Sequence, residues 1–207
     1  MKKDTIIQKI NEYFEKIENK NIYFKNFKEE IIFRKKTITE ILKNYPDLLK
    51  IINDNEKFYV LPASINHHHT YSGGLMDHSL LVVKDLLEYT EKLGLKWKNE
   101  RSPLLIGLFH DLCKIDNFTL ISEKEPRKGW KYNDKPVLIK GHGEKSVILL
   151  SKYIILTEEE VICIYWHMGA AYTSKENLPL LMKAYQDFPN CMYVNLADTK
   201  SALNVKE

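Results

Sequence analysis

The sequence contains few cysteines, and none of them forms a C-x-x-C pair. Cys113, Cys163 and Cys191 are odd in number, widely spaced and placed within apolar segments. This pattern argues against a disulfide framework and favours reduced, buried thiols. We therefore expect a cytoplasmic protein.

Long hydrophobic runs are also absent. No segment approaches the length of a membrane-spanning helix, and the N-terminal stretch MKKDTIIQKINEYFEKIENK has scattered charges instead of an apolar centre. The sequence therefore predicts neither a signal peptide nor a membrane partner.

The chain has no large excess of charge of one sign. Its 31 basic residues are nearly balanced by 28 acidic ones, which leaves a net charge of +3. That balance argues against a protein built mainly to coat nucleic acid, although it is compatible with a local basic patch. The 207 residues suffice for one good-sized domain, or a domain with a helical extension, around a substantial core.

Glycine and proline are scarce, with 8 and 7 residues, and most periodic segments predict helices. Apolar residues recur at helical spacing over 4–19 and again over about 28–53, where Pro46 predicts a break. We expect residues 1–55 to form an N-terminal helical extension and residues 56–207 to form the main domain.

The main domain begins with a loop over 60–74, which ends at Gly73–Gly74 before an apolar helix over 75–90. Another helix is expected to start near Pro103. Polar turns between β-type residues over 117–140 predict a β-hairpin or an irregular insertion. Thr157 and Glu160 resemble a capping box. Further helices are predicted over 142–154, 157–168, 178–187 and 190–204, so the fold class is all-α.

The strongest local anomaly is the segment PLLIGLFHDLCKID. Its apolar run from Leu104 to Phe109 ends abruptly in His110–Asp111. Burying an ionised carboxylate beside an imidazole is costly unless something compensates it. A metal ion would do so, and a lone buried His–Asp contact is the alternative explanation.

Other segments repeat this context. His78 lies in an apolar helix, His142 opens a helix, His167 ends one, and Asp198 sits within an otherwise apolar helix. Imidazole together with carboxylate is a ligand set for borderline divalent metals such as Fe, Mn, Zn or Co. Each residue has an ordinary alternative: His167 suits a helix C-terminus, His142 a loop, and Asp198 a buried hydrogen-bond acceptor.

The order His78, His110–Asp111, Asp198 resembles the HD superfamily of metal-dependent phosphohydrolases, which is named for its His–Asp doublet. The intervening His142 and His167 resemble the histidines of its binuclear branch. The local sequence motifs are similar to those of HD domains in the YhaM-type 3′–5′ exoribonucleases. The shared motifs, spread over about 60–204, are His68-His69-Thr70-Tyr71, Gly73-Gly74-Leu75, His78-Ser79, His110-Asp111 with Lys114, and Ala197-Asp198 with Ser201-Ala202.

The resemblance implies an HD-domain helical bundle with two divalent transition-metal ions, drawn from Mn, Fe, Co, Ni and Zn. One ion would be bound by His78, His110, Asp111 and Asp198, and the second by Asp111, His142 and His167, with Asp111 bridging. Loss of His142 or His167 as a ligand would leave a mononuclear site of the same reaction class. Two cations about 3.5–4 Å apart can share a hydroxide and clamp a phosphoryl oxygen.

Asp111 and Lys114 are the expected catalytic residues. Lys114 follows His110 by one helical turn on the same face, where its charge would stabilise a developing oxyanion. The alternative role for Lys114 is a surface lysine that caps its helix end.

Substrate contacts are expected from cations and aromatic rings around the site. Arg127, Lys128, Trp130 and Lys131 would hold phosphates and stack a base, or would simply form an exposed hairpin tip. Tyr172 would line a nucleobase pocket or belong to the core. His67, His68 and His69 cannot all face one ion, because adjacent side chains of an extended chain point to opposite sides. We place His69 and Tyr71 near the mouth of the pocket, with a plain polar loop as the alternative.

The sequence thus predicts a phosphohydrolase that cleaves a phosphoester or phosphoanhydride bond of a nucleotide or short oligonucleotide. A 3′–5′ exonuclease acting on single-stranded RNA or DNA is one alternative. The exoribonucleases carry an N-terminal OB-type barrel, whereas residues 1–55 predict helices here. A non-catalytic nucleotide- or partner-binding scaffold is the other alternative, and assembly into a homo-oligomer is compatible with either.

Overall fold

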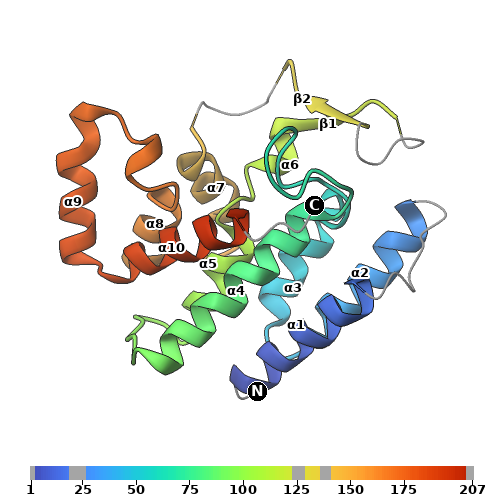
Figure 1. Cartoon of the computed structure of the whole chain (residues 1–207), viewed down its shortest axis with the longest axis horizontal. Helices are drawn as coiled ribbons and strands as arrows, with labels where there is room; N and C mark the ends of the chain where they lie inside the picture. Colours follow the sequence, from blue (N-terminus) through green and yellow to red (C-terminus); the bar gives the residue numbers. More distant parts are fainter. Residues whose placement is uncertain (1–2, 19–26, 123–128, 136–140, 204–207) are drawn as a thin grey trace. The chain divides into compact units, whose positions relative to one another are not determined.

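The computed structural model describes residues 3–18, 27–122, 129–135 and 141–203. Helices dominate these ranges, and one two-stranded sheet holds all of their strands, which confirms the all-α prediction (Figure 1). The chain divides into two compact units: residues 1–77 with 114–135, and residues 78–113 with 136–207. The predicted boundary at residues 55/56 stays a prediction.

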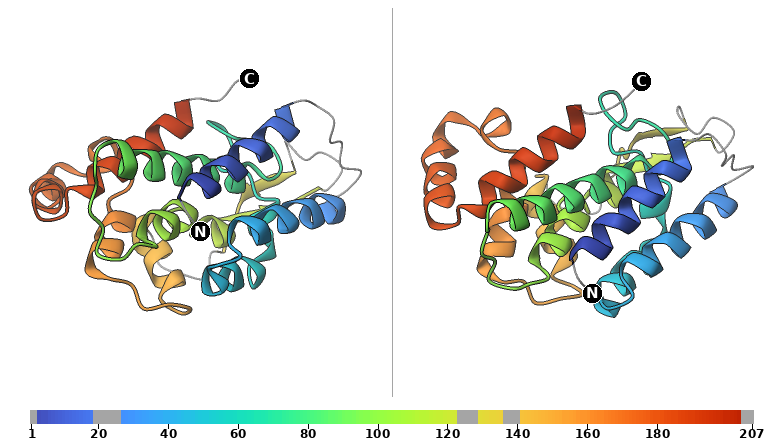
Figure 2. Two further views of the ribbon diagram at one scale, coloured as in Figure 1. Left: turned by 90° about the horizontal axis from the view of Figure 1, so that it is seen from below. Right: turned by 60° about the horizontal axis from the view of Figure 1, so that its bottom comes forward.

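The first unit begins with three helices and a 3₁₀ turn. They are α1 (Lys3–Glu18), α2 (Phe27–Ile41), α3 (Pro46–Asn53) and η1 (Glu56–Tyr59). The expected break at Pro46 is present, and the proline occupies the first turn of α3, where its missing N–H leaves no helical bond unmade. Helices α1 and α2 lie side by side (Figure 2). The two helices bury Ile6, Ile10, Tyr13, Ile38 and Ile41.

A buried ion network joins α2 to the start of α4 (Gly74–Lys92). The Arg34 guanidinium donates to Glu30 Oε1 at 2.9 Å and to Asp77 Oδ1 at 2.6 Å. Tyr13 donates its hydroxyl proton to Asp77 Oδ1 at 2.5 Å. Since Arg34 and Asp77 are only 3% and 1% exposed, their charges depend on one another for compensation.

The predicted hairpin is confirmed. A short helix α6 (Lys114–Asn117) leads into β1 (Phe118–Leu120), which pairs antiparallel with β2 (Trp130–Tyr132) so that Phe118 lies opposite Tyr132. Arg127 and Lys128, which we expected to contact substrate, lie outside the described residues.

The second unit holds the remainder of α4 and five further helices. These are α5 (Ser102–Phe109), α7 (Gly143–Leu150), α8 (Glu158–Tyr165), α9 (Leu178–Asp187) and α10 (Asn190–Leu203), with two 3₁₀ turns, η2 (Ala170–Tyr172) and η3 (Lys175–Asn177). The capping box at the start of α8 is confirmed: Thr157 Oγ1 accepts from the Glu160 N–H, and Glu160 Oε2 accepts from the Thr157 N–H.

Burial in the second unit follows the apolar runs of the sequence. Every residue of α5 is buried, which fits its continuous apolar sequence. The three cysteines are free and buried, as predicted. Within the described residues, no helix combines the length and the hydrophobicity that crossing a membrane requires.

Candidate metal centre

Five helices of the second unit each bring one or two of the predicted metal ligands to one place. His78 lies on α4, and His110 and Asp111 directly follow α5. His142 is the residue that caps α7, His167 follows α8, and Asp198 lies on α10. The structure thus brings all six candidate ligands together from these five helices, and their role as metal ligands stays a prediction.

Two glycines permit the close helix approaches behind this arrangement. A Cβ atom on Gly107 would lie 2.7 Å from Val83 Cγ2, so α5 and α4 cross at a distance that only glycine allows. A Cβ on Gly143 would lie 2.7 Å from the Ile164 carbonyl oxygen, where the start of α7 meets the end of α8. The first approach sets His110 beside His78, and the second sets His142 beside His167.

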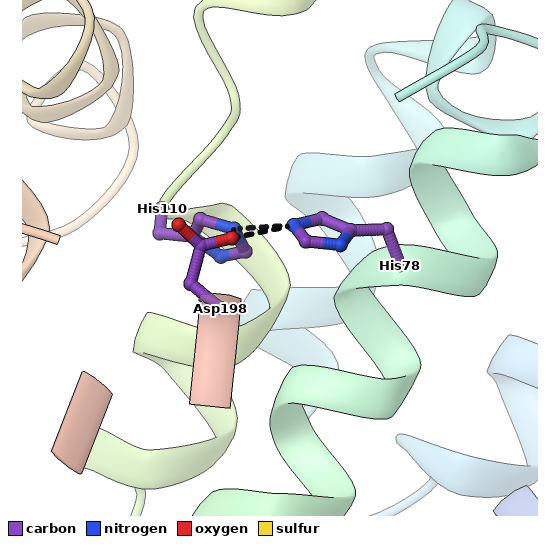
Figure 3. Close-up of side chains that lie close together, drawn as sticks. All are labelled: His78, His110 and Asp198. Atoms are coloured by element: carbon purple, nitrogen blue, oxygen red, sulfur yellow. Dashed lines mark hydrogen bonds and ion pairs between the residues drawn. The ribbon is translucent and has the colours of Figure 1, made fainter. Parts of the chain in front are cut away.

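One group consists of His78, His110 and Asp198 (Figure 3). The Nε2 atoms of the two imidazoles face each other at 3.1 Å. Asp198 Oδ1 lies 2.9 Å from His78 Nε2 and 3.6 Å from His110 Nε2. Both histidines are fully buried, and Asp198 retains 14% side-chain exposure.

Asp111 faces this group with one oxygen and a second group with the other. Its Oδ2 lies 3.6 Å from the Nε2 atoms of both His78 and His110. Its Oδ1 lies 2.5 Å from His142 Nε2 and 3.6 Å from His167 Nε2. The carboxylate is therefore positioned between the two sets of imidazoles.

Hydrogen bonds at Nδ1 define the tautomers of three of these histidines. Nδ1 of His110 donates to the Gly107 carbonyl at 3.0 Å, and Nδ1 of His167 donates to the Ile164 carbonyl at 2.7 Å. The Ser201 hydroxyl donates to the His78 carbonyl at 3.4 Å, so its oxygen accepts from His78 Nδ1–H at 3.0 Å. We assign the proton of each neutral ring to Nδ1, which leaves the Nε2 lone pair directed inward.

The charge states of the cluster depend on burial and on the two carboxylates. Burial lowers the pKa of His167, which favours its neutral form. Burial also opposes charge on His142, but Asp111 and Cys113 more than offset this and raise its pKa to about 10. Burial alone would raise the pKa of Asp198; the neighbouring His110 and His78 outweigh it in the metal-free protein and hold that pKa well below its usual range.

The donor set fits a divalent cation. Inward lone pairs on neutral imidazoles repel one another and the carboxylates unless positive charge lies among them. His167 Nε2 is buried and makes no hydrogen bond within the described ranges, since 3.6 Å to Asp111 is too long for one. Imidazole nitrogen with carboxylate oxygen suits Zn, Fe, Mn or Co.

The other residues that we expected at the site are distributed differently. Lys114, His69, Tyr71, Trp130 and Lys131 belong to the first unit, whereas all six expected ligands belong to the second. Lys114 is buried and begins α6 after a turn, so it does not continue the helix of His110 as expected. Its catalytic role stays a prediction.

The expected substrate contacts vary in exposure. Trp130 is 6% exposed, which is more typical of a core residue than of a stacking platform. Lys131 is exposed and forms an ion pair with Asp134 at 2.7 Å. Tyr172 is 76% exposed on η2, so it is not a core residue. The substrate-binding roles of all three stay predictions.

The three histidines of the run, residues 67–69, differ in burial, since one is buried and two are more exposed. His69 is buried, has a left-handed φ of 45° and contacts the Tyr71 hydroxyl through Nδ1 at 3.0 Å. Among the described residues, no group of potential metal ligands includes His67, His68 or His69. The expected place of His69 and Tyr71 near the mouth of the pocket stays a prediction.

Two residues near the candidate ligands were given no role at the site by the sequence analysis of their positions. Ser201 lies in the predicted motif, but its hydrogen bond to His78 spans 123 positions and no sequence signal indicates it. Asp111 forms a second group of potential metal ligands with His110 and His167, and Cys113 joins Asp111 and His142 in a third. The sequence indicated only a buried thiol at that position.

Comparison with known proteins gives matches to two family models. The model described as HD domain matches residues 75–203, more than half of the chain. A model described as a putative helicase matches residues 33–99, which is less than half of the chain.

A curated relative is dihydroneopterin 2′,3′-cyclic phosphate phosphodiesterase of Methanocaldococcus jannaschii. It is 34% identical over 91 residues, which are 41% of this chain and 35% of the relative. The match thus spans about a third of the relative's length. No solved structure matched the chain.

Proposed function

Since the chain belongs to the HD domain family of metal-dependent phosphohydrolases, we propose that its His/Asp cluster binds two divalent transition-metal ions and hydrolyses a phosphoester of a nucleotide-type substrate. Mn, Fe, Co, Ni and Zn are the candidate metals. The proposed ligands of the first ion are His78, His110, Asp111 and Asp198. Those of the second are Asp111, His142 and His167, with Asp111 shared.

The observation that carries this proposal is the convergence of four imidazole Nε2 atoms on the carboxylates of Asp111 and Asp198. His78, His110 and His167 each use Nδ1 in a hydrogen bond on the outer side of the cluster. Outer bonds of this kind fix ring orientation and raise the basicity of the inner nitrogen.

Divalent ions bound there lower the pKa of water toward neutrality and neutralise charge on a phosphoryl group. The chain's own contribution is orientation. Asp111 directs its two oxygens to opposite sides, 2.5 Å from His142 and 3.6 Å from His78. The rings are fully buried, with 0% exposure for His78, His110 and His167. Their burial excludes bulk water from most of the cluster. We propose that the positive charge of Lys114 stabilises the negative charge of the phosphoryl oxygens.

The substrate class is supported by the relative named above, which is a phosphodiesterase of dihydroneopterin 2′,3′-cyclic phosphate. A phosphodiester attached to a nitrogen heterocycle is accordingly the first bond to test. Nucleotides share that chemistry, which is why we propose a nucleotide or short oligonucleotide as substrate and partner.

A substrate panel tests the proposal. Protein reconstituted with Mn²⁺ would be incubated with 2′,3′- and 3′,5′-cyclic nucleotides, nucleoside mono- and triphosphates, and short single-stranded oligonucleotides. Release of a monoester from a cyclic or nucleotide substrate supports the proposal. Stepwise shortening of oligonucleotides alone would favour the exonuclease, and metal binding with no turnover on any member would favour the non-catalytic scaffold.

A further inference from the structure

The thiol of Cys113 lies beside the residues proposed to bind the second ion. Cys113 follows Asp111 by two residues in the turn after α5 and is fully buried. Its backbone N–H donates to Ser146 Oγ at 3.0 Å. Ser146 lies one turn along α7 from His142, and its own N–H bonds the His142 carbonyl at 3.2 Å. The first turn of α7 therefore holds both the imidazole and the turn that carries the thiol.

The donor atoms of this region are close enough to share an ion. Asp111, Cys113 and His142 each contribute one ligand atom, and these three atoms all lie within 4.8 Å of one another. Tetrahedral coordination with bonds of about 2.0–2.3 Å places donors roughly 3.3–3.8 Å apart. Side-chain rotations that move the donor atoms by a few tenths of an ångström to about one ångström would bring the three atoms to that spacing.

A second, independent observation points to a ligand beside the same carboxylate. His167 Nε2 is buried and makes no hydrogen bond among the described residues. It is directed at Asp111 Oδ1, 3.6 Å away, which is also the oxygen that His142 Nε2 contacts. The His142 and His167 ring centroids are 5.4 Å apart. Asp111 Oδ1 therefore lies next to nitrogens of both His142 and His167, and Cys113 shares a group of potential ligands with Asp111 and His142.

We propose that the Cys113 thiolate is the fourth ligand of the second metal ion, together with Asp111, His142 and His167. The inference rests on the proposed function, because it requires that an ion binds there. On binding, the thiol loses its proton to solvent as the sulfur–metal bond forms, and His142 loses its extra proton likewise. A thiolate makes this position favour Zn²⁺, Co²⁺ or Fe²⁺ over Mg²⁺ or Mn²⁺.

Cobalt substitution tests the inference without measuring activity. Protein loaded with two equivalents of Co²⁺ should show a thiolate-to-cobalt charge-transfer band in the near ultraviolet. Cys113→Ser should abolish the band while leaving the cobalt content at the first position unchanged. The matched control is Cys163→Ser, another fully buried cysteine that belongs to no group of potential ligands in the described ranges. That variant should retain the full band.

The wild-type protein alone also decides the question, in case Cys113→Ser does not fold. Cobalt K-edge absorption should contain a Co–S distance of about 2.3 Å. Two bound cobalt ions with only nitrogen and oxygen neighbours would overturn the Cys113 assignment and leave the proposed function intact. Failure to bind any cobalt would overturn both. A charge-transfer band that persists in Cys113→Ser would also refute the assignment.

Discussion

Replacing Ser201 by alanine tests how the outer hydrogen bonds prepare the cluster for metal. Ser201 is 1% exposed, and its oxygen accepts the Nδ1 proton of His78 at 3.0 Å. Without that acceptor, the proton of His78 is better placed on Nε2, where it bonds Asp198 Oδ1 at 2.9 Å. The lone pair that faces the ion is then lost. Removing such an outer partner typically weakens metal binding about 10- to 100-fold, or ~1.4–2.7 kcal/mol.

The assay is titration of metal-free protein with Zn²⁺ against a chromophoric chelator, with nitrogen-15 spectra of the His78 ring to report its tautomer. Ser79→Ala is the matched control, because Ser79 is also buried but its Oγ has no hydrogen-bond partner among the described residues. It should leave the affinity unchanged. Equal affinities for Ser201→Ala and wild type, or an equal loss in Ser79→Ala, would refute the argument.

Further predictions concern the shared carboxylate, the pH dependence and the first unit. Asp111→Ala should abolish turnover while circular dichroism stays native, and unchanged activity would refute the assigned site. The pKa of His142 is raised from 6.5 to about 10, so in metal-free protein its contribution to stability is full below about pH 6.5 and is lost as pH rises through 10. An imidazole titration midpoint near 6.5 by NMR would contradict this. Arg34→Met leaves two buried carboxylates without a cation and should cost about 3–5 kcal/mol in urea unfolding. Lys9→Met, at an ion pair whose side chains are 22% and 64% exposed, should cost less than about 1 kcal/mol, and equal costs would refute the role given to burial.

The helices were predictable because their causes are local. Pro46 breaks a helical pattern and begins α3, and Thr157 with Glu160 caps α8. Apolar periodicity placed the remaining helices within a few residues of where they are found. These features depend on neighbours three or four positions away, which the sequence displays directly.

The candidate ligands were predictable for a different reason. His78, His110 and Asp198 are polar side chains inside apolar helices, and a buried polar group needs a partner. The sequence could thus indicate which residues share a function. It could not indicate that Asp111 lies 3.6 Å from two rings with one oxygen and 2.5 Å from a third ring with the other. Those distances depend on how five helices pack.

Cys113 and Lys114 show where local reasoning failed. Every residue from Leu112 to Lys114 is compatible with a helix, so the sequence predicted that the helix of His110 continues. The helix ends at Phe109 instead, and a turn precedes α6 at Lys114. The bond from the Cys113 N–H to Ser146 supports this turn from a position 33 residues away. That distant contact sets the direction of the thiol, and the sequence carries no sign of it.

The most direct test of the central claim is the metal content of the reconstituted protein, measured by mass spectrometry for wild type and for His167→Gln. We expect close to two divalent ions per chain in the wild type and close to one in the variant, because His167 is proposed as a ligand of the second ion alone. A wild-type protein that retains no metal, or a variant that still retains two ions, would contradict the account.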